Sequence, residues 1–330
     1  MKEVEKIVVL GTGGTIAGTA AQASDHVGYT SAQLGVEQLL AVLPGLPRVL
    51  SGRSLVMEQV AQLDSKDMDV ATWQALAERC AHWLSQPDVH SVVVTHGTDT
   101  LEETAWFLQA VLQPAKSLVL TCAMRPATAL GADGPQNLMD ALAVAGDAPR
   151  AGTWVVCAGN IHSARQVQKV HPYRLDAFSS GDAGPVGWVE DGRVRWSAWA
   201  EAPRPEALRP AASCLALVLQ TPSAQWPRVE VLLSHACASR QMVDALVQSG
   251  VQGLVVAGTG NGSLHSALEA GLQEAVRQGV QVRLSTRCMT GQIVGTALPW
   301  PDVEGLSPVK ARISLLLSLM GARDGGLNQG

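Results

Sequence analysis

The feature that most constrains this chain is a strand-like run that ends in a polar turn and leads at once into a helical pattern. Residues 91–94 read SVVV, a largely β-branched run that is typical of a buried parallel strand. Leu101, Ala105 and Leu108 then recur at helical spacing. Because neighbouring parallel strands need a crossover segment between them, usually a helix, this order predicts an α/β fold.

Strand and helix alternate in the same way along most of the chain. We therefore expect a large N-terminal domain at residues 1–201, with a mostly parallel sheet flanked by helices. A smaller C-terminal α/β domain is expected at residues 228–330. The stretch at residues 202–227 is rich in Pro and Ala and is the predicted linker between the two domains.

The same patterns predict where the individual elements lie. Asp191-Gly192 is typical of a tight turn and predicts a hairpin over residues 187–196. The first strand begins at residue 7 and runs into a Gly-rich turn. Further strands are predicted over residues 55–60, 91–94, 117–122, 154–158, 229–233, 253–258 and 281–285, and helices over residues 35–43, 70–84, 101–112, 137–145, 240–248, 264–278 and 308–320.

The composition excludes several classes of protein. Of the 330 residues, 47% are apolar and 16% are charged, which is typical of a globular protein rather than a disordered one. The net charge of −5 provides no basic surface for nucleic acid or for an anionic membrane. No apolar run reaches the roughly 18 residues of a spanning helix, and the N-terminus leads directly into a strand. We therefore expect a cytoplasmic protein.

The six cysteines lie far apart in the sequence, and no two of them form a CxxC pair. A structural zinc site needs closely spaced ligands, so the spacing predicts no metal site. The expectation is that the thiols are free and buried, in a reducing compartment. The cysteines are Cys80, Cys122, Cys157, Cys214, Cys237 and Cys288.

The Gly-rich turn GTGGTIAG, at residues 11–18, follows the first predicted strand. A dinucleotide-binding fingerprint would need a third glycine at Ile16, and a phosphate-binding loop would need a lysine at Thr19. Neither nucleotide site is therefore predicted. The glycines instead let the backbone turn sharply and bring Thr15 to the end of the strand. Backbone N–H groups beside Thr15 would be able to stabilise an oxyanion.

The second polar turn, HGTDT at residues 96–100, allows two interpretations. In the structural one, Asp99 is a helix N-cap, residues 100–103 (TLEE) form a capping box, and His96 is a satisfied core residue. In the functional one, Thr98 and Asp99 face a ligand, because ligands of open α/β sheets bind at the carboxyl ends of the strands.

Lys169 and Ser65 also allow two interpretations. Lys169 is one of only six lysines and could simply be a solvated surface residue, and Ser65 could cap the helix that follows it. Together with Thr98 and Asp99, however, Lys169 completes a set with chemical meaning. A hydroxyl nucleophile needs a base, lysine can serve as that base, and a carboxylate can orient the lysine. Thr, Lys and Asp thus correspond to the hydroxyl, the base and the orienting carboxylate of a Ser-His-Asp triad.

Five motifs of the chain resemble those of bacterial-type L-asparaginases, and they occur in the order found in that family. They span both predicted domains, so the resemblance covers essentially the whole chain, and the two paired Thr motifs are highly specific. The family hydrolyses L-asparagine to L-aspartate and ammonia without a metal or cofactor, and many members also accept L-glutamine. The motifs are GTGGTIAG at residues 11–18, THGTDTLEETA at 95–105, AMRP at 123–126, ADGPQNL at 132–138 and AGTGNGSL at 257–264.

The resemblance implies roles for five catalytic residues. Thr15 matches the nucleophilic threonine of the first motif. Tyr29, one of only two tyrosines, lies in a polar segment with no periodicity and matches the tyrosine of the flexible loop that closes over the site. Thr98, Lys169 and Asp99 match the triad of the family.

The resemblance also implies how the substrate is bound. Ser65 matches the serine that holds the substrate α-carboxylate, and Asp99 binds the α-ammonium group. Ala123 matches a residue whose backbone carbonyl faces the leaving amide, and Thr98 also contacts the substrate. Asn261 matches an asparagine that a neighbouring subunit contributes, although asparagine is also a common turn former.

The chain departs from the family pattern at two places. Lys66 stands where many members have a Gln that touches the substrate, and a cation there disfavours an ammonium group unless it points elsewhere. The segment at residues 291–307 is short and has no clear counterpart of the glutamate that many members supply from a neighbouring subunit. Asp302 and Glu304 are the candidates for that glutamate.

The resemblance therefore implies an L-asparaginase that works through a threonine nucleophile and an acyl-enzyme. It also implies a homotetramer built from two tight dimers and no cofactor. From the composition, we expect neither nucleic acid nor a membrane as partner. Two rivals within the same class are a glutaminase-asparaginase and an amidase that acts on a larger amide. A rival from another class is a non-catalytic sensor of aspartate or asparagine.

Overall fold

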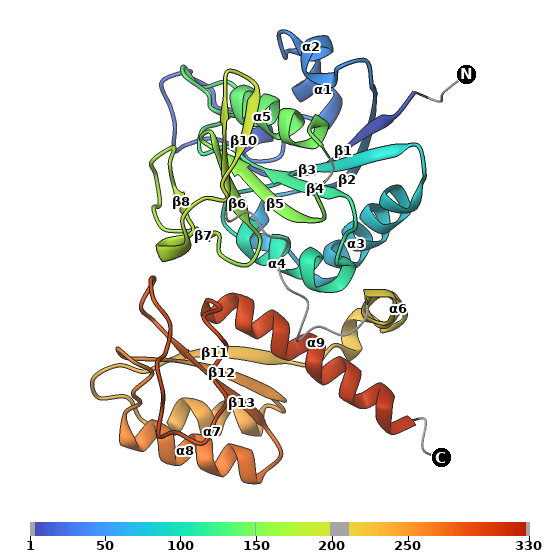
Figure 1. Cartoon of the computed structure of the whole chain (residues 1–330). Helices are drawn as coiled ribbons and strands as arrows, with labels where there is room; N and C mark the ends of the chain where they lie inside the picture. The colour runs from blue at the N-terminus through green and yellow to red at the C-terminus, as the bar shows by residue number, and fades with distance from the viewer. Residues whose placement is uncertain (1–3, 149, 199–210, 328–330) are drawn as a thin grey trace. The chain divides into compact units, whose positions relative to one another are not determined.

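The computed structural model describes residues 4–148, 150–198 and 211–327, and the chain divides into two compact units between Leu215 and Ala216 (Figure 1). Part of the predicted linker, residues 202–210, lies outside the described residues. The rest of it contains a helix that the sequence did not predict, α6 (Ala211–Gln220). The domain boundaries at residues 201 and 228 stay a prediction. Within the described residues, no helix is both long enough and apolar enough to cross a membrane.

The first unit is built on an eight-stranded mixed sheet. In the order of the sheet, its strands are β10 (Arg193–Trp196), β9 (Gly187–Glu190), β6 (Asn160–Ser163), β5 (Gly152–Cys157), β4 (Ser117–Thr121), β3 (Val89–Thr95), β1 (Lys6–Gly13) and β2 (Ser54–Leu63). The five strands from β5 to β2 pair in parallel, as predicted. The strands β6, β9 and β10 extend that sheet with antiparallel pairing.

Helices cover both faces of this sheet (Figure 1). They are α1 (Val36–Ala41), α2 (Leu46–Leu50), α3 (Val70–Ser85), α4 (Leu101–Leu112) and α5 (Gly134–Gly146). One face packs against α1, α2 and α5, and the other against α3 and α4. Because β1 and β3 lie in the middle of the sheet, both of their faces are buried, which explains their continuous runs of Val and Ile.

The predicted hairpin is present as β9 and β10, joined by Asp191-Gly192. Asp191 has φ +50° and Gly192 has φ +70°, the two positive values that a type I′ turn requires. A separate small ribbon, β7 (Gln168–Lys169) with β8 (Phe178–Ser179), lies in the region where the alternation of strand and helix stops.

The second unit holds a three-stranded parallel sheet in the order β11 (Val229–Leu233), β12 (Gly253–Gly258) and β13 (Gln281–Thr286). Its helices are α7 (Gln241–Gln248), α8 (Ser266–Arg277) and α9 (Pro308–Leu327). One face of the sheet packs against α7 and α8, and α9 covers the other. The predicted smaller α/β domain therefore has the expected architecture.

In the first unit, two glycines bring the turns after β1 and β3 into direct contact. Gly14 has φ +80°, and a Cβ atom placed there would lie 2.3 Å from the Cα of Gly97. No side chain fits between the two backbones at this distance. The contact holds together the two turns that carry Thr15 and Thr98, the next residue in each turn.

Replacing Gly14 with alanine should therefore destabilise the protein by about 3 kcal/mol or more, because a positive φ and a backbone clash combine there. Gly45 is the matched control, since it has φ +74° but a Cβ atom there meets nothing within 4 Å. The Gly45→Ala variant should lose only about 1–2 kcal/mol, the cost of the left-handed backbone alone. Urea unfolding of both variants checks this, and equal losses would show that the contact between the two turns does not matter.

Candidate active site

Four turns of the first unit carry predicted site residues to one edge of the sheet. They follow β4, β3, β1 and β2, which are consecutive strands in the sheet and all run in the same direction. The side chains or carbonyls in question belong to Ala123, Thr98, Thr15 and Ser65, in that order. The carboxyl edge of a parallel sheet is where ligands bind, so the topology alone gathers these residues at a plausible site.

Thr15 and Tyr29 are in direct contact. Thr15 lies in a short 3₁₀ turn directly after β1, and its side chain is almost fully buried. Its Oγ1 atom lies 2.7 Å from the Tyr29 Oη atom, within hydrogen-bond distance. The segment that carries Tyr29 is closed by two backbone hydrogen bonds between Thr19 and Thr30, and the Thr128 hydroxyl accepts a bond from its Ala20 N–H. The closing of this loop over the site stays a prediction.

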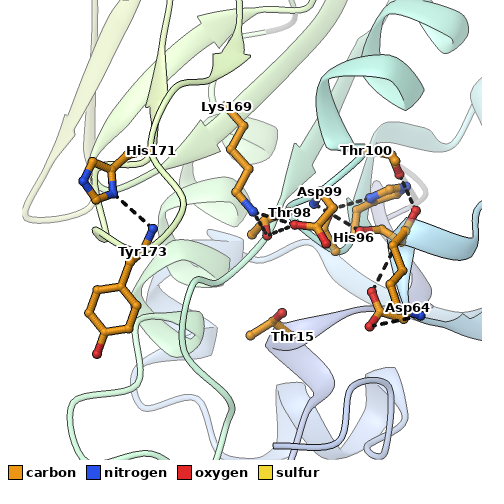
Figure 2. Close-up of polar contacts among 12 residues, drawn as sticks. Thr15, Asp64, His96, Thr98, Asp99, Thr100, Lys169, His171 and Tyr173 are labelled. Carbon is orange, nitrogen blue, oxygen red and sulfur yellow. Dashed lines mark hydrogen bonds and ion pairs between the residues drawn. The ribbon is translucent and has the colours of Figure 1, made fainter. Parts of the chain in front are cut away.

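Lys169, Thr98 and Asp99 form one hydrogen-bonded group (Figure 2). The Lys169 Nζ atom donates to Thr98 Oγ1 at 2.9 Å and to Asp99 Oδ1 at 2.6 Å. The side chain of Lys169 is 17% exposed, whereas that of Asp99 is 51% exposed. The group thus has a mostly buried cation and a carboxylate that reaches solvent, where a ligand can approach it.

The capping interpretation of the second turn is wrong. The N-cap residue of α4 is Thr100 rather than Asp99, and its side chain makes no capping hydrogen bond. The Thr100 hydroxyl instead donates to the Ser65 carbonyl at 2.7 Å. The Asp99 carboxylate is engaged by Lys169, so the interaction with this lysine determines its orientation.

Ser65 is buried beneath the second turn and does not cap the next helix, because Asp69 does. Its Oγ atom accepts a hydrogen bond from the Asp99 N–H at 3.1 Å. The neighbouring Lys66 points towards Asp67, with which it forms an ion pair, and its side chain is 60% exposed. The hydroxyl of Ser65 is therefore in direct contact with the turn that carries Thr98 and Asp99, whereas the Lys66 side chain is turned towards Asp67 and solvent.

Comparison with known proteins identifies the family. Residues 6–202 match the family described as Asparaginase, N-terminal, and residues 228–325 match the Glutaminase/Asparaginase C-terminal domain. The chain belongs to the asparaginase family. Its sequence is 37% identical to L-asparaginase 2 of Bacillus subtilis (strain 168), over 98% of this chain and 84% of that protein. It is 36% identical to the glutaminase-asparaginase of Pseudomonas fluorescens biotype A, over 98% of this chain and 90% of that protein.

A solved structure of this family has the same fold. The crystal structure of a probable cytoplasmic L-asparaginase from Campylobacter jejuni matches with a TM-score of 0.86 and 34% sequence identity. The match covers 96% of this chain and 95% of that chain. The fold predicted from the sequence is therefore the fold of the asparaginase family.

Two residues that the sequence analysis gave no role hold the segment around Ala123. The Asp133 carboxylate accepts the N–H groups of Met124 and Arg125 at 2.9 and 3.0 Å. The Asn137 side chain donates to the Cys122 carbonyl and accepts the Ala158 N–H, both at 2.9 Å. Both residues lie in the ADGPQNL motif, which pointed to this segment. The hydrogen bonds that give them a role are visible only in the folded chain.

Asn261 lies in the second unit, and its amide group is used within its own chain. Its Nδ2 atom donates to the carbonyls of Val294 and Gly295, both at 3.0 Å. Its Oδ1 atom accepts the Val294 N–H at 2.8 Å. Both amide hydrogens are therefore engaged, which favours the interpretation of Asn261 as a residue that fixes loops.

The described residues contain no group of three or more His, Cys, Asp and Glu side chains that could hold a metal ion. All six cysteines are free. Four of them are buried as predicted, but Cys237 and Cys288 are exposed.

His96, in the second turn, is fully buried, and only one of its two ring nitrogens has a hydrogen-bond partner among the described residues. Its Nδ1–H group donates to the Gly97 carbonyl at 2.7 Å, but its Nε2 atom has no partner among the described residues. Burial removes water from the charged imidazolium and lowers the pKa of His96 to about 4, although the hydrogen bond to Gly97 opposes this shift. The histidine is therefore neutral in the folded protein at physiological pH.

This shift predicts a loss of stability in mild acid. The pKa of His96 is about 4 when folded and about 6.5 when unfolded, so the unfolded chain binds the extra proton between these two values. The contribution is fully present above about pH 6.5 and is lost as the pH falls towards 4, by about 2 kcal/mol between pH 8 and pH 5. Urea unfolding of wild type and a His96→Gln variant at both pH values measures it. A variant with the same pH dependence as wild type would contradict it.

Proposed function

We propose that this protein is an L-asparaginase that hydrolyses L-asparagine to L-aspartate and ammonia. Membership of the asparaginase family supports this activity. The observation that carries the proposal is the pairing of two threonine hydroxyls with proton-bearing partners at one sheet edge. Thr15 Oγ1 lies 2.7 Å from Tyr29 Oη, and Thr98 Oγ1 lies 2.9 Å from Lys169 Nζ.

The reaction proceeds by double displacement through an acyl-enzyme. The Thr15 oxygen attacks the carbon of the side-chain amide, and Tyr29 takes part in moving the proton of the Thr15 hydroxyl. Backbone N–H groups of the Gly-rich turn and the hydroxyl of Thr98 stabilise the oxyanion. The C–N bond breaks, and ammonia leaves with the proton that Thr15 gave up. Water then attacks the ester, which releases aspartate and restores the Thr15 hydroxyl.

The triad residues act on the proton transfers of both steps. Lys169 contacts Thr98 and Asp99 simultaneously, so it can pass a proton to or from Thr98 while Asp99 holds it in place. This assignment gives Lys169 the position of the base and Asp99 that of the orienting acid.

Substrate recognition follows from the same edge of the sheet. Ser65 binds the α-carboxylate, and Asp99, whose carboxylate is half exposed, pairs with the α-ammonium group. The carbonyl of Ala123 accepts a hydrogen bond from the leaving amide. Asn261 of a neighbouring subunit stays a proposal as a substrate contact, and its bonds to its own chain count against it.

An alternative within the class is a glutaminase-asparaginase, since relatives with that name and relatives named L-asparaginase are similarly close. An amidase that acts on a larger amide is the second alternative. A non-catalytic sensor of aspartate or asparagine is disfavoured, because it would need no nucleophile, whereas Thr15, Thr98, Asp99 and Lys169 are all present.

One assay separates these alternatives. Ammonia release is measured from L-asparagine, L-glutamine and succinamic acid with the same enzyme. An L-asparaginase releases ammonia fastest from asparagine, and a glutaminase-asparaginase releases it at comparable rates from both amino acids. An amidase for larger amides is slow on all three, and release from none of them would reject enzymatic activity on these amides.

We further propose that the protein works in the cytoplasm as a homotetramer of two tight dimers. Its likeness to a relative described as a probable cytoplasmic L-asparaginase supports the compartment. Sedimentation at micromolar concentration tests the assembly, and a monomer that hydrolyses asparagine at full rate would reject it.

A further inference from the structure

Two buried cysteines lie side by side where the strands β4 and β5 end. The strands pair in parallel with Thr121 opposite Val156, so the next residues, Cys122 and Cys157, take opposing positions. Opposing residues of neighbouring parallel strands lie about 5 Å apart and direct their side chains to the same face of the sheet. The two residues are 1% and 3% exposed, and both thiols are free. The fold thus holds a pair of thiols together in its interior.

The side chain of Asn137 holds the two strand ends at this separation. Its Nδ2 atom donates to the Cys122 carbonyl, and its Oδ1 atom accepts the N–H of Ala158, both at 2.9 Å. Because Ala158 directly follows Cys157, one amide group joins the backbones beside both cysteines. A disulfide needs Cα atoms about 4.4–6.8 Å apart, and neighbouring strands meet this range. Little backbone movement is therefore needed to form one here.

His162 lies on the same face of the sheet as the two thiols. It stands opposite Val155 in the antiparallel pair of β5 and β6, and Cys157 is two positions further along β5. A ring in such a diagonal position can reach the side chain of its neighbour. The Nδ1 atom of His162 lies 2.8 Å from Ser180 Oγ, whereas its buried Nε2 atom makes no hydrogen bond of normal geometry within the described part of the chain. One ring nitrogen thus stays open for a proton.

Cys157 is the thiol of the pair that more readily becomes a thiolate. Its hydrogen bond with the Cys122 side chain lowers the pKa of Cys157, burial opposes this shift, and His162 adds to it. The same hydrogen bond, together with burial, raises the pKa of Cys122. A thiolate beside a thiol that keeps its proton is a pairing that forms disulfides, because the first attacks an oxidant and the second then attacks the first.

We propose that Cys122 and Cys157 are a modification site, at which a small peroxide converts the two thiols into a disulfide between the ends of β4 and β5. This inference does not depend on the proposed function. It concerns thiols that the proposed reaction on the amide does not use.

The oxidation takes two steps. The Cys157 sulfur attacks one peroxide oxygen, so an S–O bond forms and the O–O bond breaks, and the hydroxide that leaves becomes water with the proton that Cys157 gave up. His162 is placed to hold that proton in between. The Cys122 sulfur then attacks the Cys157 sulfur, the S–S bond forms, and the S–O bond breaks. This second hydroxide leaves as water with the Cys122 proton, so two thiols are oxidised and one peroxide is reduced to two waters.

Mass spectrometry of the full chain after treatment with hydrogen peroxide tests the site. The chain carries Cys237→Ser and Cys288→Ser, so that these exposed thiols do not link two molecules. We expect a loss of about 2 Da, a peptide pair joined through Cys122 and Cys157, and full reversal by dithiothreitol. Cys80 is the internal control, because burial raises its pKa well above the ordinary value and it should stay reduced.

Two single substitutions in the same background separate the pair from either cysteine alone. In Cys122→Ser, Cys157 has no second thiol to attack it and should instead gain oxygen as a sulfenic or sulfinic acid. In Cys157→Ser, the remaining Cys122 should oxidise about tenfold more slowly than the pair, since its pKa is raised. The comparison of treated and untreated chain without these two changes does not depend on the folding of either variant.

Thermal unfolding gives a second readout. The disulfide closes the segment from Cys122 to Cys157, so the oxidised chain should unfold about 5 °C or more above the reduced one. If both thiols stay reduced in peroxide, or are joined only after unfolding in urea, the inference is overturned. A disulfide that fails to raise the unfolding temperature would also contradict it, because the strand ends would then have to shift in order to form the bond.

Discussion

A Thr15→Ala variant should lose turnover by about 10³-fold or more while keeping its fold, because the substitution removes the nucleophile and little else. Thr15 is nearly buried, yet the change deletes only one hydroxyl and one methyl group. Its hydroxyl lies within hydrogen-bond distance of Tyr29, whose own hydroxyl remains able to bind water. The stability cost should therefore be about 1–2 kcal/mol. Ammonia release and urea unfolding measure the two effects separately.

Two controls make this result specific. A Thr15→Ser variant keeps the hydroxyl and should retain part of the activity, and binding of the product L-aspartate to Thr15→Ala should persist, because Ser65 and Asp99 are untouched. If Thr15→Ala kept a tenth of the wild-type rate, Thr15 would not be the nucleophile. Thr98, with its bond to Lys169, would then take its place in the mechanism.

The sheet could be predicted from the sequence because its central strands carry their own signature. The strands β1 and β3 are buried on both faces, and their runs of Val and Ile are typical of strands in that position. The antiparallel strand β6 has only four residues, so it left no such pattern. The helix α6 begins inside a segment rich in Pro and Ala, and that composition concealed it.

The residues that come directly after the parallel strands could also be located. Thr15, Ser65 and Thr98 each follow a strand, and the sheet order brings those strands side by side. The role of Asp99 could not be settled from its neighbours, because a carboxylate before a helix is also a good N-cap. What excludes capping is Lys169, which lies 70 residues further along the chain.

No spacing rule could have placed Lys169. It reaches the site on the two-residue strand β7, after the chain has turned back through the antiparallel strand β6. The resemblance to the asparaginase family selected this lysine, and the fold brings it to 2.9 Å from the Thr98 hydroxyl. Asn261 shows the opposite case, since the same kind of resemblance selected a residue whose amide is engaged by Val294 and Gly295.

The second large effect is expected for Lys169. A Lys169→Met variant should lose turnover by about 10²–10³-fold, since the base of the proton transfers is removed and Met has a similar length without a proton to exchange. Stability should change by less than about 1 kcal/mol, because the Asp99 carboxylate left behind is half exposed and can be hydrated. Steady-state ammonia release and thermal unfolding of the same preparation measure both quantities.

A Lys169→Arg variant separates a base from a simple positive charge. Arginine keeps the cation beside Asp99 but does not give up its proton in proteins, so it cannot act as a base. If Lys169 transfers a proton, the arginine variant should be as inactive as the methionine variant. If arginine restores turnover, Lys169 serves only to orient Asp99 and Thr98. If the methionine variant itself has normal turnover, the ion pair with Asp99 is a surface contact, and Thr98 must be activated by another group.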